Sequence, residues 1–229
     1  VYRIGEYFSN SGNSMLPGAV DPLDSVTGRC QANYHLLATD GYWNIPLSGP
    51  FNDGNFSGSV GDWDRTVPNS LPGPISGFTP GSLYPRPYYE GAAAAAAGIS
   101  DSLSDLAMHY WIRDIRPTIP DNVKDTIAPW QHVTLYALSI GLQGNVDYPA
   151  GIDAITAGTL DWPIPTGAER PDSIDDLWHA AVNSRGKYYN SSNPQQLAES
   201  IVGSLAEITS QSGTATAVGI AGAQLSATR

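Results

Sequence analysis

Runs of apolar residues alternate along the chain with stretches in which apolar residues recur every three or four positions. The first run, Tyr34 to Ala38, predicts a short buried strand that Thr39-Asp40-Gly41 brings to an end. The second run, residues 132–140, has apolar residues at both odd and even positions, which is typical of a parallel strand covered on both faces. Residues 187–190 fit a short edge strand.

Helical spacing occurs in four segments, and the first of them opens the chain. Its apolar face comprises Val1, Ile4, Tyr7 and Phe8. In the second, Ser102 and Asp105 have the spacing of a capping box. We expect this helix to end at Pro117, with Arg113 and Arg116 complementing the dipole of its last turn.

The other two helices are expected in the last third of the chain. One starts at Asp172 with acids in its first turn, and Gly186 is expected as its C-cap. The last has Asn193 as N-cap and Pro194 in the first position. Its predicted buried stripe comprises Leu197, Ile201, Val202, Leu205 and Ile208.

This order of elements predicts an α/β domain with a doubly wound, mostly parallel sheet. Residues 41–100 interrupt the pattern, because 18 of these 60 residues are Gly or Pro and nine are aromatic. Since aromatic side chains favour contact over solvent, we expect an ordered insertion rather than a linker. It leaves the carboxyl end of the first strand, the edge where open α/β sheets place ligand sites.

Composition excludes several classes of protein. The net charge of −11 argues against a nucleic-acid partner, which needs a basic face. The aromatic content of 10% argues against intrinsic disorder. The longest uncharged stretch, residues 208–228, is too polar to predict a membrane span.

Cys30 is the single cysteine of the chain. Such a thiol is commonly buried, and the alternative is a disulfide partner in chain beyond these residues. The sequence also starts within a helical pattern and without an initiator Met. We therefore expect a piece of a longer protein.

Asp40 is the first residue with possible site chemistry. A carboxylate at the carboxyl end of a strand points toward the crevice where hard cations or polar substrates bind. Taken alone, however, the Asp-Gly pair favours a simple turn.

Four segments resemble, in the same order, blocks of the PilY family of type IV pilus tip proteins. They are residues 30–44 (CQANYHLLATDGYWN), 101–117 (DSLSDLAMHYWIRDIRP), 130–141 (WQHVTLYALSIG) and 175–189 (DDLWHAAVNSRGKYY). The resemblance implies a non-catalytic role in cell-surface adhesion and in pilus biogenesis and retraction control. It also implies export through the periplasm to the pilus tip. The implied partners are minor pilins, the tip complex and a host or abiotic surface ligand.

The amino-terminal region of that family is similar to a von Willebrand factor A domain with a metal-ion-dependent adhesion site. Asp40 matches the Asp of its T-D-G motif, whereas no D-x-S-x-S motif occurs in this chain. We therefore expect residues 1–208 to be a partial domain of this kind, with Mg²⁺ or Ca²⁺ bound only in the intact domain. Residues 209–229 are expected to lead toward a separate β-propeller.

Other chemistry finds little support in the sequence. Asp62-Trp63-Asp64 comes nearest to a calcium loop, and a solvated turn explains it more simply. Asp175 and Asp176 are adjacent and suit the helix dipole better than acid–base pairing. The histidines show no paired metal spacing, and we expect structural roles for His35, His109, His132 and His179.

The predicted binding surface is therefore the aromatic face of the insertion. Its candidate residues are Trp43, Trp63, Tyr84 and Tyr88. An alternative hypothesis is a secreted carbohydrate-binding module or glycan hydrolase that uses the same insertion. That enzyme would need Asp62 or Asp64 to face Asp40 across the bound sugar.

Overall fold

The structure is a computed structural model that describes residues 1–10, 20–23, 28–43, 51–52, 57–125 and 127–213. Parts of the predicted 41–100 insertion and of the 209–229 tail lie outside these residues. No helix in the described ranges is both long and apolar enough to cross a lipid bilayer.

A three-stranded parallel sheet forms the centre of the molecule. Its strands are β1 (Asn33–Thr39), β4 (Val133–Ile140) and β5 (Tyr188–Ser191), in the order β1-β4-β5. The prediction of an α/β fold with a parallel sheet is confirmed. The described strand order advances in one direction only, so the doubly wound arrangement stays a prediction.

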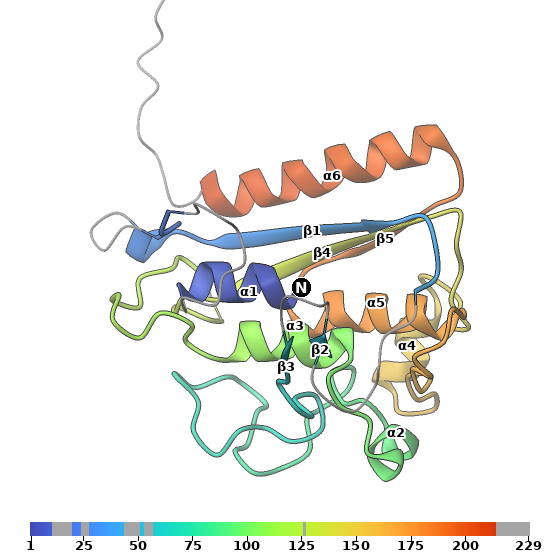
Figure 1. Ribbon diagram of the computed structural model, residues 1–229, viewed down its shortest axis with the longest axis horizontal. Helices are drawn as coiled ribbons and strands as arrows, with labels where there is room; N and C mark the ends of the chain where they lie inside the picture. Colours follow the sequence, from blue (N-terminus) through green and yellow to red (C-terminus); the bar gives the residue numbers. More distant parts are fainter. Residues whose placement is uncertain (11–19, 24–27, 44–50, 53–56, 126, 214–229) are drawn as a thin grey trace, which may run out of the picture.

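Helices cover both faces of this sheet (Figure 1). On one face lies α6 (Pro194–Gly213), and on the other lie α1 (Tyr2–Ser9), α3 (Leu103–Ile112) and α5 (Asp172–Asn183). Both crossovers, from β1 to β4 and from β4 to β5, pass through the second face. Small residues allow close packing there, since Ala107 and Ala180 meet Leu135 of β4 in one buried cluster.

The remaining elements are short. They are the 3₁₀ turn η1 (Gly28–Cys30), the antiparallel pair β2 (Phe51–Asn52) and β3 (Ser57–Gly58), α2 (Ala92–Ala97) and α4 (Gly151–Thr156). Between β3 and α2, the chain packs on the side of α3 that faces away from the sheet (Figure 1). Val67 and Tyr84 join Met108 and Trp111 of α3 in a second hydrophobic cluster. We refer to residues 57–91 as the aromatic segment.

Helix α3 begins where its cap predicts and ends earlier than expected. Ser102 and Asp105 form the reciprocal capping box, as their spacing indicates. The helix stops at Ile112, not at Pro117, because Arg113 adopts an extended conformation. Arg116 then pairs with Asp21 across the fold and does not serve the last turn of the helix.

The end of α5 also differs from expectation. The left-handed position belongs to Arg185, whose φ is 61°, and not to Gly186. Gly186 is required for a different reason, because a Cβ atom there would lie 1.8 Å from the carbonyl oxygen of Leu135 in β4. This glycine lets the chain pass directly against the central strand.

Helix α6 is capped by Asn193 as predicted, and its predicted buried stripe is met only in part, since Leu197, Ile201 and Ile208 are half-buried. Asn193 Oδ1 accepts the backbone N–H of Gln196 at 3.0 Å. Val202 and Leu205 are 65% and 53% exposed, whereas Ser204 is buried. The helix packs on β5 and β4, and Val202 and Leu205 are too exposed to belong to that interface.

Two further expectations of burial are wrong for the same kind of reason. Strand β1 is an edge strand of the described sheet, and Leu36 at its centre is 40% exposed. Cys30 is also exposed, since η1 lies just before this edge strand. A disulfide partner for Cys30 in chain beyond these 229 residues stays a prediction.

Candidate functional site

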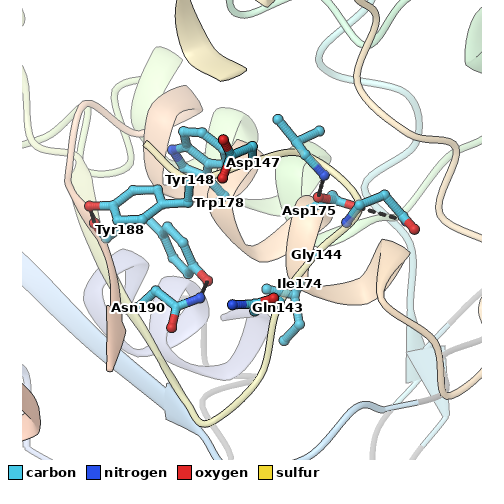
Figure 2. Close-up of a pocket in the computed structure, with 11 residues that line it drawn as sticks. Gln143, Gly144, Asp147, Tyr148, Ile174, Asp175, Trp178, Tyr188 and Asn190 are labelled. Carbon is cyan, nitrogen blue, oxygen red and sulfur yellow. Dashed lines mark hydrogen bonds between the residues drawn. The ribbon is translucent and has the colours of Figure 1, made fainter. Parts of the chain in front are cut away.

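A cavity of about 250 Å³ lies at the carboxyl edge of the sheet, where β4 and β5 end (Figure 2). We refer to it as the rim pocket. It is lined by Gln143, Gly144, Asn145, Val146, Asp147, Tyr148, Ile174, Asp175, Trp178, Tyr188 and Asn190. This is the edge at which a parallel α/β sheet is expected to bind ligands.

The loop that forms one wall is held by Asp175 in the first turn of α5. Its carboxylate accepts the backbone N–H groups of Asn145 and Val146 at 2.8 and 2.9 Å, and the Asn145 side-chain amide at 2.9 Å. Gly144 permits this contact, because a Cβ atom there would lie 2.1 Å from Asp175 Oδ1. Burial raises the pKa of Asp175, and the three hydrogen bonds oppose that shift. The carboxylate therefore organises the pocket rather than only complementing the helix dipole.

Three aromatic rings form the opposite wall (Figure 2). The ring of Tyr148 meets Trp178 and Tyr188 edge-on, with centroids 5.0 and 4.8 Å apart. The Tyr148 hydroxyl donates to the backbone oxygen of Tyr188 at 2.6 Å, which fixes the ring. A rigid aromatic wall beside the amides of Gln143 and Asn190 suits a ligand with polar groups and a flat apolar face.

The lining contains no Ser, Cys, His or Lys side chain. Its one buried carboxylate, Asp175, is already engaged by three donors. The pocket thus has the groups for recognition, and its lining lacks a nucleophile paired with a base.

Asp40 lies at the same edge of the sheet, exposed at the end of β1. Thr39 Oγ1 accepts the Gly41 N–H at 3.3 Å and donates to the Gly41 carbonyl at 2.7 Å, so the tripeptide is a tight turn. Within the described ranges, three acidic side chains that could together hold a metal ion lie close to one another, and they are Asp62, Asp64 and Asp105. Asp40 is not among them. Its role as a ligand in an intact domain stays a prediction.

The four aromatic residues predicted as a binding surface lie in different surroundings. Trp43 is half-buried and packs against the hydrophobic cluster that contains Trp178 and Tyr188 of the rim pocket. Tyr84 is only 3% exposed, so its ring is unavailable to a partner in this conformation. The prediction is corrected there, because Tyr84 fills the core beneath the aromatic segment.

Trp63 and Tyr88 are half-buried and make internal contacts. The ring of Trp63 meets His109 edge-on at 4.6 Å. The guanidinium of Arg185 lies 3.7 Å from the Tyr88 ring centroid and 3.8 Å from that of Trp111. These contacts hold the aromatic segment on α3 and on the turn that follows α5, and Trp63 and Tyr88 stay candidates for binding.

The histidines occupy structural positions, in line with the expectation. Burial lowers the pKa of His109 and of His179 to about 3, so both rings are neutral near pH 7. His179 stacks on Trp162 with centroids 4.5 Å apart and donates from Nε2 to the Tyr88 carbonyl at 3.1 Å. Burial also lowers the pKa of His35, to about 4, and that of His132.

Asp176 has a role that the sequence reasoning missed. It reaches from α5 to the first turn of α3, where its carboxylate accepts the N–H groups of Leu103 and Ser104 at 2.9 and 3.0 Å. Burial raises its pKa to about 6. In the sequence, the signal was an aspartate, Asp176, among the apolar residues of a helix face. Only the tertiary structure shows that Asp176 caps the start of α3.

The Asp62-Trp63-Asp64 turn is not solvated as expected. Asp64 is 2% exposed, and it lies with Asp62 beside Asp105 of α3. The hydrolase hypothesis needs one of these acids to face Asp40, and the structure groups them with Asp105 instead.

Comparison with known proteins gives a consistent set of relatives. Three curated proteins of Pseudomonas aeruginosa, each named type IV pilus biogenesis factor PilY1, match most of the chain. The protein of strain PAK is 35% identical over 224 residues and that of strain PAO1 33% identical over 224 residues, each match covering 85% of this chain. The protein of strain UCBPP-PA14 is 27% identical over 226 residues, or 86% of this chain. The chain spans 17% of the length of each relative. No protein-family model matches the chain, and no solved structure matches it.

Proposed function

Because the chain belongs to the PilY family, we propose that it is a non-catalytic unit of the type IV pilus machinery, acting in pilus biogenesis. The observation that carries the proposal is the identity of 33–35% over 85% of the chain to curated pilus biogenesis factors. The recognition chemistry of the rim pocket agrees with a role in binding.

We assign residues 1–208 to a von Willebrand factor A-like domain, of which they form a part. Three parallel strands with helices on both faces support this assignment. The same assignment makes Asp40 a metal ligand or its neighbour in the intact domain. Residues 209–229 would then connect to the propeller.

The rim pocket and the adjoining Trp43 are the proposed contact surface for the minor pilins and the rest of the tip complex. They combine an aromatic wall with exposed polar groups at the ligand-binding edge of the sheet. Adhesion to a host or abiotic surface, control of retraction, and a position at the pilus tip after export are parts of the same proposal.

Site-specific photo-cross-linking tests this surface. A photoreactive amino acid replaces Asp147, which is exposed at the pocket, or Glu199, which is exposed on α6. The experiment is done in a piliated bacterium whose genome encodes this chain, and the cross-linked products are identified by mass spectrometry. We expect pilus proteins to be captured from position 147 and not from position 199. Capture from neither position, or equally from both, would refute the pocket as the contact surface.

A further inference from the structure

The rim pocket offers hydrogen-bond acceptors more than donors, because two of its amide side chains have their nitrogen engaged inside the fold. Asn190 Nδ2 donates to the Leu142 carbonyl oxygen at 2.8 Å, and Asn145 Nδ2 donates to Asp175 Oδ2 at 2.9 Å. Since a carbonyl or carboxylate oxygen can only accept, neither amide can exchange its nitrogen and oxygen without losing its bond. The Oδ1 atoms of Asn145 and Asn190 are therefore left as acceptors for a ligand.

Two carboxylates give the pocket negative charge. Asp175 accepts three N–H groups, which is the pattern of an ionised carboxyl group. Asp147 is exposed at the same pocket. The lining includes no Lys, Arg or His, and in the described part of the chain the ion pairs join other residues. The charge of the rim pocket is thus left for a ligand to balance.

Tyr148 adds an aromatic surface to these acceptors (Figure 2). Its ring is half-buried, and the bond from its hydroxyl to the Tyr188 carbonyl oxygen holds it in place. Trp178 and Tyr188, which it contacts edge-on, are 5% and 3% exposed, so Tyr148 provides most of the accessible ring surface. An aromatic ring close to carboxylates is a favourable environment for a cation.

The size of the cavity and its groups select one kind of cation. The volume of about 250 Å³ is smaller than the range of about 300–1,000 Å³ typical of small-molecule pockets, and it suits a single side chain. A guanidinium group carries five N–H donors in one plane, has no acceptor, and stacks its flat face on aromatic rings. An ammonium group is compact, strongly hydrated and without a flat face, so it matches this wall less well.

We infer that the rim pocket binds an arginine side chain on the surface of a partner protein. Asp147 pairs with the guanidinium, and Tyr148 stacks on its face. The Oδ1 atoms of Asn145 and Asn190 accept further N–H groups. The net charge of −11 likewise favours a partner with a basic surface. The inference rests on the proposed function, in which this pocket is a contact surface, and it names the chemistry of that contact.

NMR spectroscopy of the purified 229-residue chain tests the inference. The probes are Nα-acetyl-arginine methylamide, its uncharged citrulline counterpart of nearly the same shape, and its lysine counterpart. Each probe is titrated while the amide signals of Asn145, Tyr148 and Asn190 are followed.

The variants remove or reverse the exposed charge of the pocket. They are Asp147→Asn and Asp147→Lys, and the matched control is Asp153→Asn, which neutralises another exposed acid, on α4 and outside the pocket lining. Circular dichroism checks that each variant is folded, which is expected because both positions are exposed.

We expect the arginine probe to shift the pocket signals with a dissociation constant of about 1 mM, a weak affinity that suits a probe of this size. The lysine probe should bind about threefold and the citrulline probe about tenfold more weakly. Asp147→Asn should weaken binding of the arginine probe by about fivefold, and Asp147→Lys should abolish the shifts. Asp153→Asn should bind like the wild type.

Absence of shifts in the pocket at about 20 mM arginine probe would overturn the inference, as would equal affinity for the citrulline or the lysine probe. Equal weakening by Asp147→Asn and Asp153→Asn would overturn it too, because binding would then follow the overall charge. Photo-cross-linking at position 147 separates this inference from the proposed function. Capture of pilus proteins without arginine binding refutes the arginine chemistry alone, whereas arginine binding without such capture refutes the pilus contact alone.

Discussion

Replacing Asp175 should dismantle one wall of the rim pocket. In Asp175→Ala, the N–H groups of Asn145 and Val146 lose their acceptor, and Val146 is 7% exposed. Hydrogen bonds to a charged group contribute about 1.5–3 kcal/mol each, and the cost of burying the carboxylate offsets part of this. We therefore expect the free energy of unfolding to fall by about 2–4 kcal/mol. For a chain of this length, that corresponds to a decrease in melting temperature of about 5–15 °C.

Two measurements check this prediction. Thermal unfolding gives the global loss, and amide hydrogen exchange reports the two affected N–H groups directly. The control is Asp121→Ala, an exposed acid for which we expect a change within about 0.5 kcal/mol. If Asp175→Ala unfolds like the wild type and the amides of Asn145 and Val146 keep their protection, the account of how the pocket is built is wrong.

Three further changes test the packing that positions the site. Gly186→Ala should destabilise the fold by about 1–3 kcal/mol in denaturant titrations, because its Cβ would lie 1.8 Å from a β4 carbonyl oxygen. The control, Gly41→Ala, should be nearly neutral, because its Cβ would meet no atom within 4 Å. Arg185→Lys should lower the free energy of unfolding by about 1–2 kcal/mol, because an ammonium group cannot stack between the rings of Tyr88 and Trp111 as the guanidinium does. An unchanged denaturation midpoint would contradict this prediction. Val202→Ser and Leu205→Ser should each change stability by less than about 0.5 kcal/mol, because both side chains are exposed on α6. A large loss would show that both side chains are buried.

The elements that sequence predicted correctly are those defined by local signals. The capping box of α3 needs only Ser102 and Asp105, three residues apart, and it forms as expected. The apolar run before Gly141 similarly gives β4, which is buried along all but its last residue. Such patterns depend on backbone geometry that neighbouring residues set among themselves.

The expectations that failed depend on the width and edges of the sheet. Leu36 and Val202 have apolar side chains in suitable periodic positions, yet both are exposed because α6 covers β4 and β5 rather than β1. Periodicity indicates which face of an element is apolar, but it does not indicate whether another element reaches that face.

The candidate sites were only partly accessible from the sequence. Proximity to the carboxyl edge of the sheet was predicted for Asp40, and the rim pocket lies at that edge. The partners of Asp175 and Asp64 were not predictable, since they lie about 30 and 40 residues away along the chain. Contacts of that kind follow from the tertiary fold and not from spacing.

Surface piliation tests the central claim most directly, that this chain acts in pilus biogenesis through the rim pocket. In a piliated bacterium that encodes the chain, the exposed pocket residues Gln143 and Asp147 are both replaced by Arg, and Glu199→Arg on α6 is the matched control. Pilin sheared from the cell surface is then quantified at equal levels of the variant proteins. We predict that the double pocket variant loses surface pilin while the α6 variant retains the wild-type amount. Wild-type piliation in the pocket variant, with the protein present and folded, would contradict the account.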